Sequence, residues 1–288
     1  MKYGYLIYLF ICLSLFAGCD IINPEEQEAA YISIQQVNLS TDLDIQGSNS
    51  SNIKDAWIYI DDNLIGAFPL PCKIPSLKTG NHKISIGAGI QVNGSSMLRT
   101  PYIFYRFYQQ ENVNLEAGYV TELNPVVTYF DSITFGFKAN FDDLSGNKLT
   151  STAVSDTTVE LTTDASKVFE GTGSCLARLL RDSGLVEFQM IDPVTLPKGG
   201  RNIFLELDYK TTHDLVIGLR SYYTGASTKE EILLSLRANS NWNKVYINLT
   251  KAVSTQVNAA NYRIYFSAYK QAGSVPLEIL LDNLKIVY

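Results

Sequence analysis

Alternating apolar and polar residues run through the second half of this chain, and a period of two restricts such segments to β-strands. The clearest case is residues 202–210, whose side chains form two alternating sets: Ile203, Leu205, Leu207 and Tyr209 against Phe204, Glu206, Asp208 and Lys210. Further strands are predicted at residues 215–223, 232–237, 244–249, 262–269 and 277–288. Helical periodicity is almost absent from residues 134–288. The pattern therefore predicts a two-sheet jelly roll of about eight strands.

The composition agrees with an all-β protein. Tyrosine is abundant, with 18 residues, and tyrosine is favoured on pleated, half-buried surfaces. The chain has 288 residues, of which 46% are hydrophobic, so it can build two domains of common size with ordinary cores. The formal net charge is −6 and no basic block is present. Because phosphate binding needs clustered Lys and Arg, nucleic acid is excluded as the expected partner.

Residues 31–130 also show short strands separated by turns. A strand is predicted at residues 56–60, and Asp61-Asp62-Asn63 forms its turn. The next segment, 64–70, cannot be a central strand, because Pro69 and Pro71 lack the N–H group that a strand inside a sheet donates. A second turn at residues 78–81 leads into a strand at 82–86.

Residues 57–86 resemble the PEGA type of small surface β-module. The parts come in the same order: a strand, the D-D-N turn, L-I-G, P-L, and then L-x-x-G-x-H-x-I-x-I. The resemblance implies a small Ig-like β-sandwich over residues 31–130 and says almost nothing about function. The hydrophobic alternation, with Gly and Asn at the bends, predicts the same fold independently.

A dense group of aromatic residues lies at 99–108. If this segment is one strand, its side chains divide between two faces: Tyr102, Phe104, Arg106 and Tyr108 on one, and Ile103, Tyr105 and Phe107 on the other. One face must be core. The other could be a binding surface or an interdomain contact, and we favour core together with domain packing.

The N-terminus has the order of parts of a secretory signal: Lys2, an uncharged stretch at residues 3–18, and small residues before a cysteine. Phe16-Ala17-Gly18-Cys19 resembles the lipobox of bacterial lipoproteins, although Leu is commoner than Phe at the first position. The resemblance implies a signal peptide over residues 1–18 and lipidation of Cys19. An ordinary signal peptide or one transmembrane helix is the alternative, but the run is short for a span of about 20 residues.

Residues 19–30 are predicted to be an acidic tether that holds the first domain off the membrane. In Bacteroidota, acidic residues close behind the lipidated cysteine resemble a signal for export to the cell surface, and Asp20, Glu25, Glu26 and Glu28 fit this loosely. The resemblance implies a lipid-anchored protein of the outer membrane, exposed at the cell surface. Plain solvation is the alternative role of these acids.

The remaining small motifs concern cysteines and hydroxyls. Cys12 leaves with the signal, and Cys72 and Cys175 are expected to be small buried residues rather than a disulfide. No Cys or Cys/His group has metal-ligand spacing. Asp131-Ser132-Ile133 and Asp156-Thr157-Thr158 resemble the O-glycosylation site of Bacteroidota, which would place glycans on Ser132 and Thr157.

Residues 131–288 resemble the galactose-binding-like jelly roll that occurs in many carbohydrate-binding modules. The similar segments are the opening at 139–146, the glycine turn and strand at 168–178, the closing strand at 277–287, and Trp242 before the strand at 244–249. The resemblance implies the fold of the whole second domain. It implies sugar binding less strongly, because many relatives bind protein or nothing known.

The same resemblance implies one structural calcium ion between the first and last strands. The matching acids are Asp142, Asp143 and Asp282, with carbonyls near residues 171–174. Calcium prefers several carboxylate and carbonyl oxygens, so this donor set has the right chemistry. The alternative is that Asp142 and Asp143 form a turn and that Asp282 accepts hydrogen bonds at a strand end.

A candidate ligand-binding surface follows from alternation in two strands. Arg220 and Tyr222 share one face of their strand, and Arg263, Tyr265 and Tyr269 share one face of another, each opposite an apolar set. These faces should point to solvent. If the strands are neighbours, aromatic rings and planar polar groups form a surface suited to a glycan or a protein. The alternative is that Tyr and Arg are simply common on exposed sheets.

Catalysis is not expected. The chain has no G-x-S-x-G, H-E-x-x-H or phosphate loop. His213 is isolated, and Glu230 and Glu231 are adjacent in a strand, so they point to opposite faces. Two hypotheses remain. The protein is either a glycan-binding surface lipoprotein or a structural accessory lipoprotein that docks on an outer-membrane protein complex.

Overall fold

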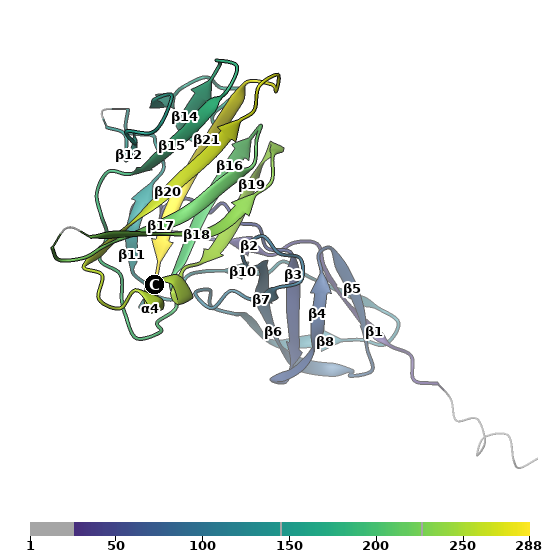
Figure 1. Cartoon of the computed structure of the whole chain (residues 1–288). Coiled ribbons are helices and arrows are strands. Elements are labelled where there is room, and N and C mark those ends of the chain that lie inside the picture. The colour runs from purple at the N-terminus through teal and green to yellow at the C-terminus, as the bar shows by residue number, and fades with distance from the viewer. Residues whose placement is uncertain (1–25, 145, 226) are drawn as a thin grey trace, which may run out of the picture.

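The computed structural model describes residues 26–144, 146–225 and 227–288 and is built almost entirely from β-strands (Figure 1). This confirms the all-β fold class. The predicted signal peptide at residues 1–18, with Cys12, and the predicted lipidation and tether residues Cys19, Asp20 and Glu25 lie outside the described residues. Within the described part of the chain, no helix has the length and apolar character needed to cross a membrane.

The first half forms small sheets, which we call the N-terminal sheets. The largest has the order β4-β3-β6-β7, with β8 also paired to β6. Its strands are β3 (Asp55–Ile60), β4 (Asn63–Pro69), β6 (Gly80–Gln91), β7 (Arg99–Pro101) and β8 (Tyr108–Leu115). Asp61 and Asp62 connect β3 to β4 with φ of 51° and 62°, as a tight hairpin turn requires. The turn predicted at this place is therefore present.

Two smaller sheets complete this half. In the first, β1 (Ala30–Ile34) lies between β5 (Cys72–Ser76) and β9 (Val120–Leu123). In the second, β2 (Asn38–Leu39) pairs with β10 (Val126–Val127). A single helical turn, α3 (Leu43–Gln46), follows β2.

The second half is a sandwich of two sheets, which we call the C-terminal sandwich (Figure 1). One sheet has the order β13-β14-β21-β16-β19, with β11 paired to β21. Its strands are β11 (Phe135–Ala139), β13 (Val159–Thr162), β14 (Ser174–Leu179), β16 (Phe204–Thr211), β19 (Asn239–Asn248) and β21 (Leu277–Val287). We refer to it as the six-stranded sheet.

The other sheet has the order β12-β15-β20-β17-β18 and is called the five-stranded sheet. Its strands are β12 (Leu149–Ser151), β15 (Gly184–Met190), β17 (Leu215–Tyr222), β18 (Thr228–Leu236) and β20 (Asn261–Lys270). One apolar core fills the space between the two sheets. Each of the six strands predicted between residues 202 and 288 is present. The helix α4 (Thr250–Thr255), which joins β19 to β20, was not predicted.

The N-terminal sheets cover the outer side of the six-stranded sheet. Phe204, Tyr246 and Val287 from that sheet belong to the core of the N-terminal half. The Phe204 ring lies 5.3 Å from the Tyr102 ring, between centroids, in an edge-to-face contact. The apolar cores of the two halves therefore meet at this sheet.

The aromatic segment at 99–108 is not one strand, so this prediction was wrong. Strand β7 ends at Pro101 and β8 begins at Tyr108. Between them the backbone turns, with the Tyr105 N–H donating to the Tyr102 carbonyl. The turn breaks the alternation, so that neighbouring side chains Phe104 and Tyr105 are both buried. Their packing at the junction of the two halves agrees with the favoured interpretation of core and domain contact.

Candidate functional site

The predicted Arg and Tyr residues gather on one side of the five-stranded sheet. Strands β17 and β20 pair antiparallel, with Arg220 opposite Arg263 and Gly218 opposite Tyr265. The alternate residues of both strands enter the sandwich core. We call the outward side of this sheet the open face. Its polar and aromatic residues are Glu187, Gln189, Arg220, Tyr222, Glu230, Arg263, Tyr265 and Tyr269.

Arg220 lies at the centre of the open face and is held by three side chains. Its Nε donates to Glu230, one Nη to Gln189 and the other Nη to Glu187, each at 2.7 Å. Burial acts to lower the pKa of Arg220, but the bonds from Glu187 and Glu230 raise it above its usual value. The guanidinium is therefore charged and fixed in one position.

Sequence reasoning missed the three partners of Arg220. Glu187 and Gln189 come from β15 and Glu230 from β18, so the chain separates them from Arg220 by 33, 31 and 10 residues. Only the pairing of four strands brings them together. The spacing of Glu187 and Gln189, two residues apart in a strand, was the one available signal that they share a face.

Tyr265 lies flat against the sheet beneath Arg220. The Arg220 guanidinium is 4.6 Å from the centre of its ring. A Cβ at Gly218 would come within 2.2 Å of the same ring, so only glycine leaves room for it. Tyr265 is consequently 5% exposed and Arg220 8% exposed. The expectation that both point freely to solvent was therefore wrong, because they cover each other.

Tyrosine rings lie at the two ends of the open face and differ in exposure. Tyr269 is 60% exposed. Tyr222 is half-buried and contacts Arg263, whose guanidinium lies 5.2 Å from its ring centre. Tyr222 pairs with Asn261, eight residues before Tyr269 on β20. At a rise of about 3.3 Å per residue, the two ends are about 26 Å apart.

A cavity of about 420 Å³ lies at the Tyr269 end. Tyr269, Ser267 and Val216 line it from the sheet, and His213 lines it from the preceding loop. The His213 imidazole is hydrogen-bonded to Ser274 at 3.1 Å, and burial lowers its pKa. The open face is thus a long strip with a hollow at one end, which suits an elongated ligand.

Asp142 and Asp282, two of the three residues predicted to bind calcium, accept hydrogen bonds from donors of the chain itself. Asp142 Oδ1 accepts hydrogen bonds from the backbone N–H groups of Thr172 and Gly173. Asp282 accepts from the Ser174 hydroxyl at 2.5 Å and from the Asn283 N–H at 2.8 Å. These oxygens face donors rather than an ion.

No additional acids complete such a site. Among residues 26–144, 146–225 and 227–288, which include Asp143, no group of three or more His, Cys, Asp and Glu side chains could hold a metal ion. Burial raises the pKa of Asp282 to about 7. Calcium binding by Asp142, Asp143 and Asp282 stays a prediction without geometric support.

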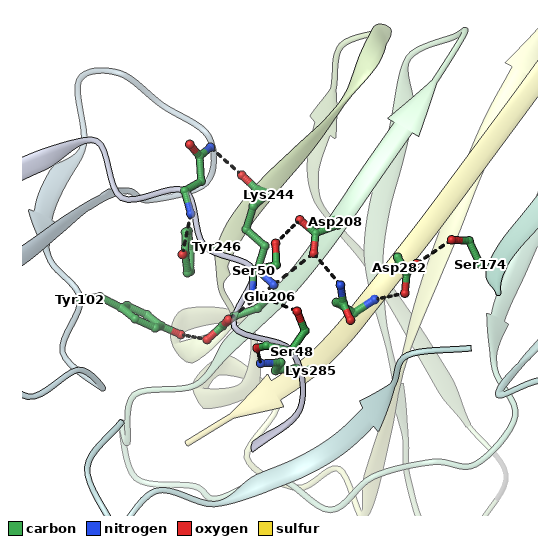
Figure 2. A network of polar contacts seen from close by, with 12 residues as sticks. Ser48, Ser50, Tyr102, Ser174, Glu206, Asp208, Lys244, Tyr246, Asp282 and Lys285 are labelled. Atoms are coloured by element: carbon green, nitrogen blue, oxygen red, sulfur yellow. Dashed lines mark hydrogen bonds and ion pairs between the residues drawn. The ribbon is translucent and has the colours of Figure 1, made fainter. Parts of the chain in front are cut away.

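A second polar cluster lies on the outward side of the six-stranded sheet, which we call the covered face. Its charged residues are Glu206, Asp208, Lys244, Asp282 and Lys285, and Figure 2 shows how they connect the two halves of the chain. Glu206 accepts hydrogen bonds from Tyr102 at 2.7 Å and Tyr129 at 2.9 Å, and lies 3.8 Å from the Lys244 ammonium.

The rest of the covered face is equally well paired. Asp208 accepts from Ser50 at 2.8 Å and lies 3.5 Å from Lys244. Lys285 donates to the Ser48 carbonyl at 2.5 Å, and burial lowers its pKa to about 8. Because these groups are buried and bind one another, the cluster joins the two halves and offers no surface to a ligand. Sequence analysis did not identify it.

The hydroxyls predicted to carry glycans differ in accessibility. Ser132 is exposed in the turn before β11. Thr157 is half-buried, and its hydroxyl donates to the Arg178 carbonyl at 2.7 Å. Glycosylation of both stays a prediction.

Cys72 is half-buried, Cys175 is buried, and both are free thiols.

Comparison with known proteins identifies distant structural similarity alone. No family model and no curated protein matches the sequence. A xylan-binding domain of carbohydrate-binding module family 22 has a TM-score of 0.38 at 12% identity, over 55% of this chain and 96% of that one. The family 11 module from Clostridium thermocellum, in complex with a mixed-linked tetrasaccharide, has a TM-score of 0.37 at 11% identity, over 52% of this chain and 94% of that one.

A third structure, from a study of promiscuous specificity in β-sandwich carbohydrate-binding modules, covers 81% of this chain and 84% of its own, with a TM-score of 0.38 and 12% identity. Similarities at this level are too distant to transfer a ligand or a site residue.

Proposed function

We propose that this protein is a non-catalytic, lipid-anchored lipoprotein of the outer membrane that binds a glycan chain along the open face at the cell surface. The observation that supports this most is the layout of the open face. A tyrosine lies at each end, Tyr269 exposed and Tyr222 half-buried, and fixed planar polar groups lie between them. An extended chain of sugars meets the requirements of such a strip better than a small compact ligand.

The chemistry of the face suits sugars. Aromatic rings such as Tyr269 pack against the apolar C–H faces of a sugar, and planar polar groups hydrogen-bond its hydroxyls. Gln189 accepts from Arg220 through its oxygen, which leaves its amide N–H groups to donate to a ligand. Glu230 is half-exposed and can accept from a hydroxyl. Since Arg220 holds both side chains in place, binding would cost little additional ordering.

The same contacts support a binding role rather than hydrolysis. A glycosidase needs one carboxylic acid that donates a proton and a second carboxylate that acts as base or nucleophile. Glu187 and Glu230 are the carboxylates of the open face, and both accept hydrogen bonds from Arg220. Both are therefore engaged as acceptors by the same cation.

A glycan array probed with the full lipoprotein in mild detergent tests the proposal. We expect binding to one or more polysaccharides, and Tyr269→Ala should weaken it about ten-fold, the effect of losing one aromatic contact. Tyr119→Ala is the matched control, because Tyr119 is 64% exposed in the N-terminal half. Loss of binding in both variants, or in neither, would contradict a site on the open face.

The anchor is tested separately. Cys19→Ala should prevent lipidation, so that the protein is released by a carbonate wash or stalls before export. A variant that stays membrane-bound would refute the lipoprotein assignment. If the native lipoprotein binds no glycan and instead co-purifies stoichiometrically with an outer-membrane protein, the role of accessory subunit replaces the proposed one.

A further inference from the structure

The two arginines of the open face differ in how well they are paired. They lie directly opposite each other on β17 and β20. Arg220 has ion pairs with Glu187 and Glu230, both at 2.7 Å. Arg263 has none: within the described part of the chain, no carboxylate oxygen lies within 4.0 Å of its guanidinium.

Arg263 also has unused hydrogen-bond donors. Among the described residues, its one hydrogen bond runs from Nη1 to the Tyr222 hydroxyl at 3.3 Å, which is long for such a bond. Its Nε–H is buried and has no partner in the same part of the chain. A guanidinium carries five N–H donors, so most of those on Arg263 lack a protein acceptor. A buried donor without a partner destabilises a fold, because its hydration is lost and not replaced.

Within the described part of the chain, no carboxylate offsets the charge of Arg263. Like charges that face each other on adjacent strands repel, and Arg263 faces Arg220. The carboxylates nearest in the sheet, Glu187 and Glu230, are already bound to Arg220. The structure thus has one positive charge on the open face that is neither neutralised nor fully hydrogen-bonded.

Tyr222 completes an arrangement suited to an anion. Its oxygen accepts from Arg263, and its own O–H proton stays available for donation. The Arg263 guanidinium also lies over the Tyr222 ring, at 5.2 Å, which orients its planar fork. Charged N–H donors beside a hydroxyl donor are well matched to an oxyanion.

We propose that the glycan bound along the open face carries an oxyanion, either the carboxylate of a uronic acid or a sulfate ester, and that Arg263 with Tyr222 binds this group. The inference rests on the proposed function and specifies its ligand as an acidic polysaccharide. Arg263 supplies the charge, and Tyr269, six residues and about 20 Å away along β20, contacts a neutral part of the chain.

Matched pairs of polymers test the charge of the ligand. The full lipoprotein in mild detergent is assayed against polygalacturonate and its methyl ester, and against a sulfated galactan and the same galactan after desulfation. We expect one acidic polymer to bind at least ten-fold more tightly than its neutral partner, and its affinity to fall with rising salt. The pair that shows this difference distinguishes carboxylate from sulfate.

Variants of Arg263 locate the effect. Arg263→Gln should weaken binding of the acidic polymer about ten-fold or more and leave the neutral polymer unchanged. Arg263→Lys should lie between, because it keeps the charge but loses the planar fork. Arg201→Gln is the control: it removes one positive charge at an exposed position outside the open face. Melting temperatures verify that each variant is folded.

Two results would overturn the inference in different ways. If acidic and neutral polymers bind equally, and Arg263→Gln changes neither while Tyr269→Ala weakens both, the anion site is wrong and the glycan-binding proposal stands. If none of the four polymers binds and the glycan array is also negative, the proposed function fails and the inference fails with it.

Discussion

The two outward faces of the C-terminal sandwich are both polar, but one is buried under the N-terminal sheets and the other is open to solvent. On the covered face, Glu206 is fully buried under the N-terminal sheets, with hydroxyl and ammonium partners at 2.7–3.8 Å. On the open face, Glu230 is half-exposed, and Arg263 has no carboxylate partner among the described residues. Strands with the same alternation thus form a buried contact between the two halves on one side and a surface open to solvent on the other.

The two faces differ in how completely their polar groups are paired. Burial of a charge is tolerated when every group has a partner, and the covered face achieves this with residues from both halves of the chain (Figure 2). On the open face the pairing of Arg263 is incomplete among the described residues, and the Tyr269 ring is exposed. Completeness of pairing, and not polarity, separates the two.

The largest expected effect comes from breaking the covered face. Glu206→Ala leaves the buried Lys244 without one of its two carboxylate neighbours and removes the acceptor of Tyr102 and Tyr129. We expect the free energy of unfolding to fall by about 3–5 kcal/mol, as when a buried ion pair loses one member. Urea denaturation measures this directly. A loss below about 1 kcal/mol would mean that the covered face does not hold the two halves together.

A smaller effect on the free energy of unfolding is expected from pH, through the titration of Asp282. Its carboxyl titrates near pH 4 in an unfolded chain and at about 7 in the fold. Between these values the native state keeps a proton that the unfolded state has released. The free energy of unfolding therefore decreases as pH rises through this window, by about 2 kcal/mol between pH 5 and pH 7.

The variant Asp282→Asn isolates this contribution, because the other titrating groups, including His213, stay in place. Urea unfolding of both proteins at pH 5 and pH 7 should show a decrease for wild type that is smaller in Asp282→Asn. Equal slopes in the two proteins would show that Asp282 is hydrated, and that the covered face is less well sealed than its burial indicates.

The smallest effect is expected on the open face. Glu230→Ala removes one partner of Arg220, but the bonds to Gln189 and Glu187 stay in place. Since the Glu230 side chain is about half-exposed, the loss should be about 0.2–1 kcal/mol by urea denaturation. It is the matched counterpart of Glu206→Ala, because both variants remove one glutamate from a sheet face. Equal losses in the two variants would remove the distinction between the faces.

Sequence reasoning succeeded where the signal was local. The strands at residues 202–288 and the Asp61-Asp62 turn follow from alternation and turn chemistry, which depend on neighbouring residues. It failed at residues 102–107. The aromatic residues there alternate as they would in a strand, but the backbone turns after Pro101. For the site, alternation placed Arg220 and Arg263 on outward faces, but it could not identify Glu187 as a partner of Arg220.

The sequence by itself determined that the second half of the chain is a β-sandwich with apolar inner and polar outer sides, because a period of two is set residue by residue along each strand. Only the tertiary structure decided which outer side is buried beneath the N-terminal sheets and which is open. That choice depends on strand order and on contacts between residues as far apart as Ser48 and Lys285, which no local pattern encodes.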